Sequence, residues 1–385
     1  MIIPWKNIYR FTAKLLKQPQ YAIWVALKRL QAFLSYYTGK GKSFQPESIT
    51  LFLTEKCNLR CKMCGQWGES GVTKNKAAGD VKAELDFETL KKFIDQISYF
   101  KPSITLFGGE PMLYPKCVEL IKYIKNKKMH VLMITNAALI KGKAAELVES
   151  GLDELNVSLD GPRDLHDQIR GLPGLFETIT AGLKKVQAYK KAKKLKFPLI
   201  NLQCTITKYN YLQLEKMIEV AEDIGANSLT YHNLIFVNQD LIEKQKVYDH
   251  QLKCSSDNWK GFVFAPEIDS DILYDKMQLI LNRKYSFSVD FYPNLSRDGL
   301  KDYYNNPSYL PDEYPKRCLS PWVCAYVFPD GGVRPCLNST YAFGNINNEK
   351  FNAIWNSRKA VEYRQILKKN KLFATCIRCT ELYRY

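Results

Sequence analysis

Apolar and polar residues follow each other along most of this 385-residue chain in the order expected for strands alternating with helices. From residue 47 onward, short apolar runs are separated by longer segments whose apolar residues recur every three or four positions. The expected strands are Ile49–Leu53, Ser103–Phe107, His130–Ile134, Glu154–Leu159, Ile200–Ile206 and Ser228–Leu234, and the expected helices include Phe87–Tyr99, Cys117–Lys127, Lys141–Ser150, Leu175–Lys193 and Leu212–Ile224. Six successive strand–helix units predict an α/β fold with a parallel sheet wound one way.

Residues 1–46 have a different pattern, with eight Lys or Arg and no Asp or Glu. Two amphipathic helices hinged near Pro19 are expected. The apolar residues of the second are Ile23, Trp24, Leu27, Leu30, Phe33, Leu34 and Tyr37. Such a basic helix can lie on an anionic membrane surface, or its apolar face can pack on the body of the protein. The longest uncharged run, Gln18 to Leu27, is half of what spans a bilayer.

The charge and the cysteine content indicate in which cellular compartment the protein works and which partners suit it. The net charge is +17 and the cysteine count is 11, an odd number that does not suit a disulfide framework. We therefore expect a cytoplasmic protein with peripheral contact to the inner membrane face as one option. The lysine-rich run from Lys184 to Lys196 is interpreted as a solvated helix face rather than an RNA-binding site, so no nucleic-acid partner is expected.

Three cysteines with the spacing CxxxCxxC follow the first expected strand, namely Cys57, Cys61 and Cys64. Three thiolates on one tight loop can hold three irons of a four-iron cubane, which otherwise takes four thiolates, and so leave one iron open. The alternatives are a zinc knuckle or three unrelated buried thiols. A zinc knuckle needs a fourth local ligand, and the next Cys or His is Cys117.

This motif resembles that of the radical S-adenosylmethionine (SAM) superfamily. The resemblance implies a [4Fe-4S] cluster whose open iron binds SAM, and reductive cleavage of SAM to a 5′-deoxyadenosyl radical that abstracts hydrogen from a substrate. It also implies a partial TIM barrel of six strand–helix units and an electron donor such as flavodoxin or ferredoxin. In barrels of this kind, chemistry takes place at the carboxyl ends of the strands.

Polar motifs stand at those strand ends. Gly108-Gly109-Glu110-Pro111 follows the second strand and Thr135-Asn136-Ala137 the third, with Ala137 where the family often has glycine. The fourth strand is followed by His166 and Asp167, which are expected to be part of a capped helix start. By resemblance, the SAM-contacting residues are Gly108, Gly109, Glu110, Asn136, Ser158, Asp160 and Arg170.

A second cysteine group lies near the carboxyl end of the chain. It resembles the SPASM domain of the same superfamily, or its shorter twitch form, which holds an auxiliary iron–sulfur cluster. The preferred ligands of a second [4Fe-4S] cluster are Cys318, Cys336, Cys376 and Cys379, with Cys324 as a competitor. A tetrahedral zinc site would use the same inventory and stays an alternative.

Four regions follow from these patterns. They are a basic helical extension at 1–46, a radical SAM core at 47–235, a linker close to the substrate at 236–305 and a SPASM/twitch domain at 306–385. The expected activity is hydrogen abstraction assisted by the second cluster, with oxidation of a sugar, an alcohol or a lipid-linked molecule preferred to peptide maturation. Outside the enzyme class, the alternatives are an iron–sulfur electron carrier and a zinc-stabilised RNA-binding module.

Overall fold

A single ten-stranded sheet runs through the computed structural model, which describes residues 15, 18–74, 76 and 84–384. Its strand order is β10-β9-β8-β1-β2-β3-β4-β5-β6-β7; the strands from β8 through β1 to β7 run parallel to one another, and β9 is antiparallel to both β8 and β10. The strands are β1 Ser48–Phe52, β2 Ser103–Phe107, β3 Val131–Thr135, β4 Glu154–Ser158, β5 Leu199–Thr205, β6 Ser228–His232, β7 Ser288–Tyr292, β8 Cys324–Val327, β9 Gly332–Arg334 and β10 Gly344–Asn345. The predicted α/β fold with a parallel sheet is confirmed.

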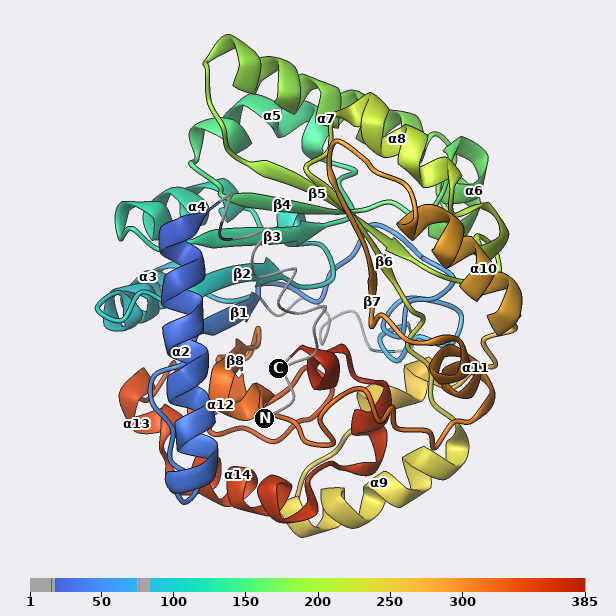
Figure 1. Cartoon of the computed structure of the whole chain (residues 1–385). Helices are drawn as coiled ribbons and strands as arrows, with labels where there is room; N and C mark the ends of the chain where they lie inside the picture. Colours follow the sequence, from blue (N-terminus) through green and yellow to red (C-terminus); the bar gives the residue numbers. More distant parts are fainter. Residues whose placement is uncertain (1–14, 16–17, 75, 77–83, 385) are drawn as a thin grey trace.

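Helices connect the strands and cover the outer face of the curved sheet (Figure 1). The α-helices are α2 Pro19–Thr38, α3 Phe87–Ile97, α4 Cys117–Asn126, α5 Ile140–Glu149, α6 Arg163–Arg170, α7 Leu175–Ala192, α8 Lys216–Ile224, α9 Gln239–Leu252, α10 Ser270–Leu281, α11 Arg297–Asn305, α12 Ser320–Val323, α13 Phe351–Trp355 and α14 Arg358–Asn370. Short 3-10 helices lie at η2 Pro111–Leu113, η3 Tyr211–Gln213, η4 Asp257–Phe262, η5 Ala374–Arg378 and η6 Thr380–Tyr383. No helix in the described part of the chain is long and apolar enough to span a bilayer.

The sheet is larger than the six parallel strands that we expected. The region 236–305, expected to be a linker, contributes α9, α10, α11 and a seventh parallel strand, β7, which pairs with β6. The C-terminal region contributes β8, which pairs in parallel with β1. β7 follows a long connection that holds α9, η4 and α10, and β8 begins at the candidate ligand Cys324, so the pattern alone did not reveal them.

Two buried arginines fix the C-terminal region to the rest of the chain. Arg364 in α14 donates to the carbonyls of Pro321 and Gly41 at 2.8 and 3.2 Å. Arg378 donates to the carbonyls of Tyr303 and Asn306 at 2.9 and 2.7 Å. Because a buried guanidinium needs its donors satisfied, each arginine holds several segments in one arrangement. The segment around Arg378 is therefore firmly placed against α11.

Side chains alternate between the two faces of the sheet. Residues of β4 to β6 that point to the covering helices are buried, for example Leu155, Leu202 and Leu229. Their chain neighbours point to the inner, concave face and are partly exposed. This alternation gives the barrel a packed outer layer and a partly exposed inner wall.

Candidate active site

The three cysteines of the CxxxCxxC motif lie on the loop that leaves the carboxyl end of β1. The loop is wound tightly, since the Cys64 amide donates to the Cys61 carbonyl at 3.0 Å and the Gly68 amide to the Cys64 carbonyl at 2.9 Å. A Cβ atom at Gly68 would lie 2.6 Å from the Cys64 carbonyl oxygen, so glycine is required there. Burial, followed by the neighbouring Cys61 charge and other nearby groups, raises the pKa of Cys57 to about 11.

Nitrogen donors surround these sulfur atoms. The Arg170 guanidinium donates to Cys61 Sγ at 3.6 Å, and the backbone amide of Trp67 donates to Cys64 Sγ at 3.4 Å. The side-chain amide nitrogen of Asn136 lies 4.0 Å from Cys57 Sγ. N–H groups directed at sulfur suit thiolates that carry charge, as cluster-bound cysteines do. The donor set of three thiols on one loop therefore fits a [4Fe-4S] cluster with an open iron.

The two glycines after β2 are required by close packing against the cysteine loop. Gly108 has φ +152°, and a Cβ atom there would lie 2.6 Å from the Thr54 carbonyl oxygen. A Cβ atom at Gly109 would lie 2.2 Å from the Lys56 carbonyl oxygen. The amides of Gly109 and Glu110 donate to Thr54 and Lys56 carbonyls, both at 2.8 Å. This segment therefore fixes the start of the cysteine loop.

Glu110 joins the ends of β2 and β3 through its side chain. Its carboxylate accepts hydrogen bonds from Thr135 Oγ1 at 2.7 Å, from the Asn136 amide at 2.8 Å and from the Met112 amide at 3.0 Å. Burial raises the pKa of Glu110, and these hydrogen bonds act in the opposite direction. Because three donors occupy the carboxylate, a contact with SAM at this position would come from the backbone.

The turn after β3 keeps the geometry of a glycine turn without glycine. Ala137 is buried and adopts φ +62°, a left-handed conformation that costs energy for a residue with a Cβ atom. It holds Asn136 beside the thiols, where the Asn136 side chain donates to Asn58 Oδ1 at 2.8 Å. The departure from the usual glycine therefore leaves this turn intact.

Asp160 and Arg170 form a buried ion pair below the cysteine loop. Arg170 Nε donates to Asp160 Oδ2 at 2.5 Å, and the second Asp160 oxygen accepts from the Thr205 amide at 2.8 Å. Burial alone would lower the pKa of Arg170, but Asp160 and Cys61 outweigh it and raise that pKa. The structure thus brings Asp160, Arg170 and the Cys61 thiol together. Part of the hydrogen-bonding capacity of Arg170 is used by Asp160.

Two residues that support Asp160 have no clear signal in the sequence. Asn210 donates to the Asp160 carbonyl at 2.7 Å, and the Asp160 amide donates to His166 Nδ1 at 3.1 Å. Burial, followed by the Arg170 charge, lowers the pKa of His166 well below its usual value. Asp167 accepts from the Gly174 and Phe176 amides at 2.6 and 2.7 Å. Asp167 therefore caps the start of α7. Helix α6, which contains His166 and Asp167, has no side-chain cap at its own start.

The inner wall from β4 to β7 consists of polar rungs. Partner positions of neighbouring strands place Asn156, Asn201 and Ser228 on one rung, with hydrogen bonds of 3.0 and 2.9 Å between them. The full set on the wall is Asn156, Ser158, Asn201, Gln203, Thr205, Ser228, Thr230, His232, Ser288, Asp290 and Tyr292. The expected cofactor residue Ser158 belongs to this wall.

The two residues at the end of β6 lie on opposite faces of the sheet. His232 is on the inner wall, with Nε2 at 2.6 Å from Gln203 Oε1. Tyr231 is buried on the outer face, where its hydroxyl donates to the Leu214 carbonyl at 2.7 Å. Of these two neighbours, only His232 therefore faces the inner wall.

The four preferred auxiliary cysteines are brought together from three segments of the C-terminal region. Cys318 precedes α12, Cys336 follows β9, and Cys376 and Cys379 lie within and directly after η5. Burial, followed by the charges of Cys376 and Cys379, raises the pKa of Cys318 well above its usual value. Burial raises the pKa of Cys376 to about 12, and Cys336 contributes to that increase. A mutually close set of four thiols fits a fully ligated auxiliary cluster.

Two further cysteines are placed differently from one another. Cys324, the competitor for the auxiliary site, is buried in β8 with Sγ at 3.1 Å from Ser48 Oγ of the paired strand β1. Cys254 lies close enough to Cys336 for its charge to raise the pKa of that thiol, after burial as the main cause. Nothing in the spacing of Cys254 pointed to this neighbourhood, because it precedes the group by more than sixty residues.

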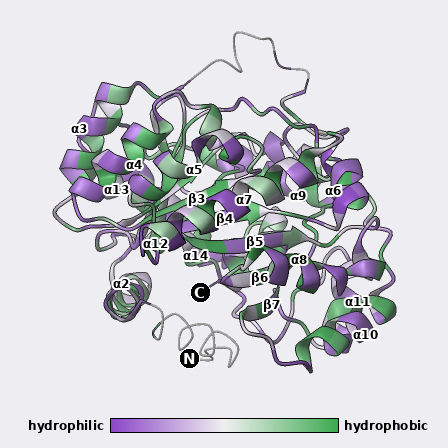
Figure 2. Cartoon of the chain, turned by 90° about the horizontal axis from the view of Figure 1, so that it is seen from above, coloured by the Kyte–Doolittle hydropathy of each residue, from purple (hydrophilic) through white to green (hydrophobic). Residues whose placement is uncertain are grey.

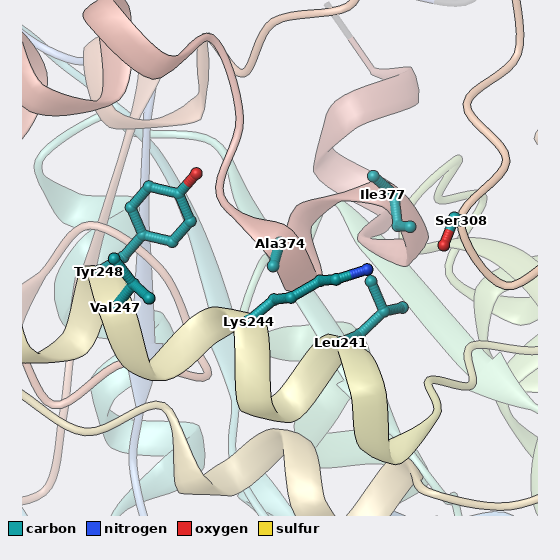
Figure 3. A pocket seen from close by; sticks show the side chains of 7 residues that line it. All are labelled: Leu241, Lys244, Val247, Tyr248, Ser308, Ala374 and Ile377. Atoms are coloured by element: carbon teal, nitrogen blue, oxygen red, sulfur yellow. The ribbon is translucent and has the colours of Figure 1, made fainter.

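A shallow hollow lies outside the auxiliary segment, between α9 and η5 (Figure 3). Its lining is Leu241, Lys244, Val247, Tyr248, Ser308, Ala374 and Ile377. Ala374 and Ile377 lie on either side of Cys376 in the chain, so the auxiliary segment reaches the surface at this hollow. Within the described residues, no three His, Cys, Asp or Glu side chains converge as ligands of a single metal ion.

Comparison with known proteins agrees with both cysteine sites. The model of the radical SAM superfamily matches residues 51–221, and that of an iron–sulfur cluster-binding domain, SPASM, matches residues 318–380. The AdoMet-dependent heme synthase of Methanosarcina barkeri is 27% identical over 337 residues, covering 87% of this chain and 88% of the relative. A tungsten-containing aldehyde ferredoxin oxidoreductase cofactor-modifying protein of Pyrococcus furiosus is 24% identical, with 86% of each chain covered.

Solved structures show the same fold. Streptococcus suis SuiB bound to the precursor peptide SuiA matches with a TM-score of 0.62 at 13% identity, over 91% of this chain and 78% of SuiB. The enzyme anSMEcpe with bound AdoMet matches with a TM-score of 0.53 at 19% identity, over 83% of each chain. The cofactors are therefore SAM, the [4Fe-4S] cluster of the three-cysteine loop and auxiliary iron–sulfur ligation in the C-terminal domain. The chain belongs to the radical SAM superfamily and carries a C-terminal SPASM domain.

Proposed function

We propose that this radical SAM enzyme oxidises a small, polyhydroxylated substrate, such as a sugar or another alcohol. The observation that carries this proposal is the polar inner wall of the barrel, where eleven positions from β4 to β7 present Asn, Ser, Gln, Thr, His, Asp or Tyr. A wall of hydrogen-bonding groups can bond substrate hydroxyls as well as its own neighbours, which an apolar ligand cannot exploit. The names of the heme-synthesising relatives refer to a large, mainly apolar ring, which suits this wall poorly.

The chain itself positions the reacting groups. When bound, SAM and its cluster supply a 5′-deoxyadenosyl radical that removes a hydrogen atom from a substrate carbon. Asn136 and Arg170 stand beside the thiols that would hold the cluster, and Ser158 and Asp160 follow one another on the same side of β4 and its end. These four residues are proposed to orient SAM together with the backbone of Gly108, Gly109 and Glu110.

Oxidation of an alcohol to a carbonyl also removes the hydroxyl proton and a second electron. His232 is the one histidine on the inner wall: His130 precedes β3 at the opposite end of the barrel, His166 is a buried residue of α6 and His250 is exposed on α9. We therefore assign His232 as the group that accepts the proton, because an imidazole can do so near neutral pH. Gln203 orients its ring through the 2.6 Å contact.

Tyr292 connects the inner wall to the auxiliary site, to which the second electron would pass. Its ring contacts that of His232, with centroids 5.8 Å apart, and its hydroxyl donates to the carbonyl of Thr380 at 2.5 Å. Thr380 directly follows Cys379. Substrate held at His232 would therefore be separated from the auxiliary cysteines by little more than one tyrosine.

A reductant must supply the first electron, and we propose an acidic carrier of the flavodoxin or ferredoxin class. The net charge of +17 favours fast association with an acidic protein. The SPASM-side cysteines Cys318, Cys336, Cys376 and Cys379 would bind a second four-iron cluster. Assignment of Cys324 as a ligand is not supported by its contact with Ser48.

The experiment that tests the substrate class follows deuterium. The anaerobically reconstituted enzyme is reduced in the presence of SAM and, separately, perdeuterated sugars, a deuterated short peptide and an iron porphyrin deuterated on its side chains. We expect deuterium in 5′-deoxyadenosine from the sugar arm, measured by mass spectrometry. Deuterium from the peptide or porphyrin arm alone would reject the proposal.

The role of His232 is tested separately from radical formation. His232→Gln keeps a polar side chain on the wall, and we expect it to lower product formation by about 10² to 10⁴ while leaving SAM cleavage in place. His250→Gln is the matched control on exposed α9. Unchanged product formation by His232→Gln would remove its role as proton acceptor without affecting the substrate class.

Peptide modification is the second candidate function. It is supported by the structural likeness to SuiB, which was solved with a precursor peptide. At 13% identity this likeness shows the fold, and the inner-wall residues favour hydroxyl groups over a peptide chain. The peptide arm of the deuterium experiment decides between the two.

A further inference from the structure

Helix α2 has an outward face that no described part of the protein covers. Its inward face is made of small residues and Tyr36, whose ring packs edge-on against Trp322 at 5.0 Å. The outward face carries a stripe of large apolar side chains at alternating spacings of four and three. These are Ile23, Leu27, Leu30, Leu34 and Tyr37, which are 55%, 57%, 56%, 47% and 53% exposed.

This stripe contains no charge. All exposed residues of α2 are uncharged, namely Pro19, Gln20, Ile23, Ala26, Leu27, Leu30, Leu34, Tyr37 and Thr38. The two charged residues of the helix, Lys28 and Arg29, lie beside the stripe and outside it. Arg29 is paired with Glu47 at 3.0 Å. A continuous apolar face of this length on a soluble protein marks an interaction surface. Self-packing, which we considered from the sequence, does not account for it.

The helix lies across the amino ends of the strands, opposite the cysteine loop (Figure 1). Gln18 donates to Glu154 at the start of β4, and the Tyr21 ring stacks on His130 before β3 at 4.0 Å. Arg29 pairs with Glu47, directly before β1. Figure 2 shows α2 end-on at the margin of the molecule. The apolar stripe and the proposed active site therefore occupy opposite ends of the barrel.

The loops at this end of the barrel are basic. Exposed lysines precede β2, β3 and β5, namely Lys101, Lys128, Lys193, Lys194 and Lys196. Two nearby acidic residues are ion-paired, Asp153 with Lys125 at 2.6 Å and Glu154 with His130 at 3.2 Å. Positive charge around an apolar stripe would repel a second copy and attract an anionic surface.

We propose that the outward face of α2 docks on an anionic lipid bilayer, with the stripe in the interface and the lysines against the headgroups. An amphipathic helix binds in this way through apolar burial and lipid charge together, and each lysine near the surface adds to the attraction. The geometry has a second consequence. A chain docked through α2 presents its cysteine loop to the aqueous side, so the helix serves as an anchor and substrate arrives from water.

The test measures co-sedimentation of the full, cluster-loaded chain with vesicles. One set contains equal parts of phosphatidylglycerol and phosphatidylcholine, and the other contains phosphatidylcholine alone. We expect binding to the anionic set that weakens as salt is added. The double variant Leu27→Asp, Leu34→Asp should lose this binding. Leu279→Asp, on α10 at a side chain 59% exposed, is the matched control and should retain it.

Four outcomes would overturn the proposal or the orientation that it assigns. The wild-type chain could fail to bind anionic vesicles, or the double variant could bind as well as wild type, which would place the contact outside α2. Light scattering could instead show an oligomer that the double variant dissociates, without vesicle binding, which would assign the stripe to a second copy. Release of 5′-deoxyadenosine should proceed at the same rate on and off vesicles, and its inhibition by anionic vesicles would reject the proposed orientation.

Discussion

The two cysteine sites are built in opposite ways. Around the three-cysteine loop, the supporting groups are buried and polar: Glu110, Asn136, Asp160, His166 and Asn210 link the carboxyl ends of β2 to β5 through side-chain hydrogen bonds. Around the four auxiliary cysteines, the neighbours are aromatic. Tyr363 is buried among them, and Phe373 packs edge-on against it with ring centroids 5.7 Å apart.

The difference follows from what each site must do. A site that binds a charged, polar cofactor at an open iron needs fixed donors and acceptors in a water-excluding frame. A fully ligated cluster needs its thiols held apart from solvent, and an apolar shell does this. The first site should therefore fail when one polar partner is changed, and the second when a ligand is removed.

The largest effect is expected from Cys61→Ala. Loss of one of three thiols removes the cluster that cleaves SAM, so 5′-deoxyadenosine should fall to the background of protein-free assays. Cys117→Ala is the control, since Cys117 is buried in α4 with its sulfur 3.9 Å from Met133 Sδ. SAM cleavage that survives in Cys61→Ala would break the assignment of this loop.

The second effect distinguishes the two sites. Cys376→Ala should lower the iron content from about eight to about four per chain and stop product formation, while SAM is still cleaved without coupling. Cys324→Ala is the control and should keep about eight irons, because its sulfur contacts Ser48 in the sheet. A loss of iron in Cys324→Ala would instead make it an auxiliary ligand.

The strands of the barrel could be predicted from the sequence because each is an apolar run bounded by turn residues. Ser103–Phe107 is found as predicted, and the other five predicted strands shift by one or two residues at their ends. The strands β7 and β8 could not be predicted. β7 follows a long connection that contains α9, η4 and α10, where the regular alternation of strand and helix is interrupted, and β8 gains its place by pairing with β1, which lies far away in sequence.

The motif residues of the candidate site were identified by local pattern, whereas their supports were not. Gly108 and Gly109 stand out as a pair, but the atoms that demand glycine belong to residues 54–56. Asn210 and His166 bind Asp160 from two different connections of the barrel. Such contacts depend on the fold bringing strand ends together, which no local spacing records.

A medium effect is expected when the ion pair below the cysteine loop is broken. Asp160→Asn leaves Arg170 buried without its carboxylate and should lower SAM cleavage about 10- to 100-fold. It should also destabilise the fold by about 3–5 kcal/mol. Asp240→Asn, which breaks the exposed pair with Lys244, is the control and should cost less than about 1 kcal/mol. Equal effects of the two variants would contradict the buried polar frame.

The smallest effect concerns His166, whose folded-state pKa lies well below its usual value because of burial and the Arg170 charge. Below about pH 6.5 the unfolded chain binds a proton that the folded chain excludes, so the free energy of unfolding should fall as pH decreases, by up to about 1.4 kcal/mol per pH unit. His166→Gln should remove this share of the slope, measured by urea unfolding from pH 7 downward to about pH 5. The exposed His250→Gln should keep the wild-type slope. If both variants keep it, His166 is protonated in the fold, and the Asp160 amide cannot donate to its Nδ1 as the structure has it.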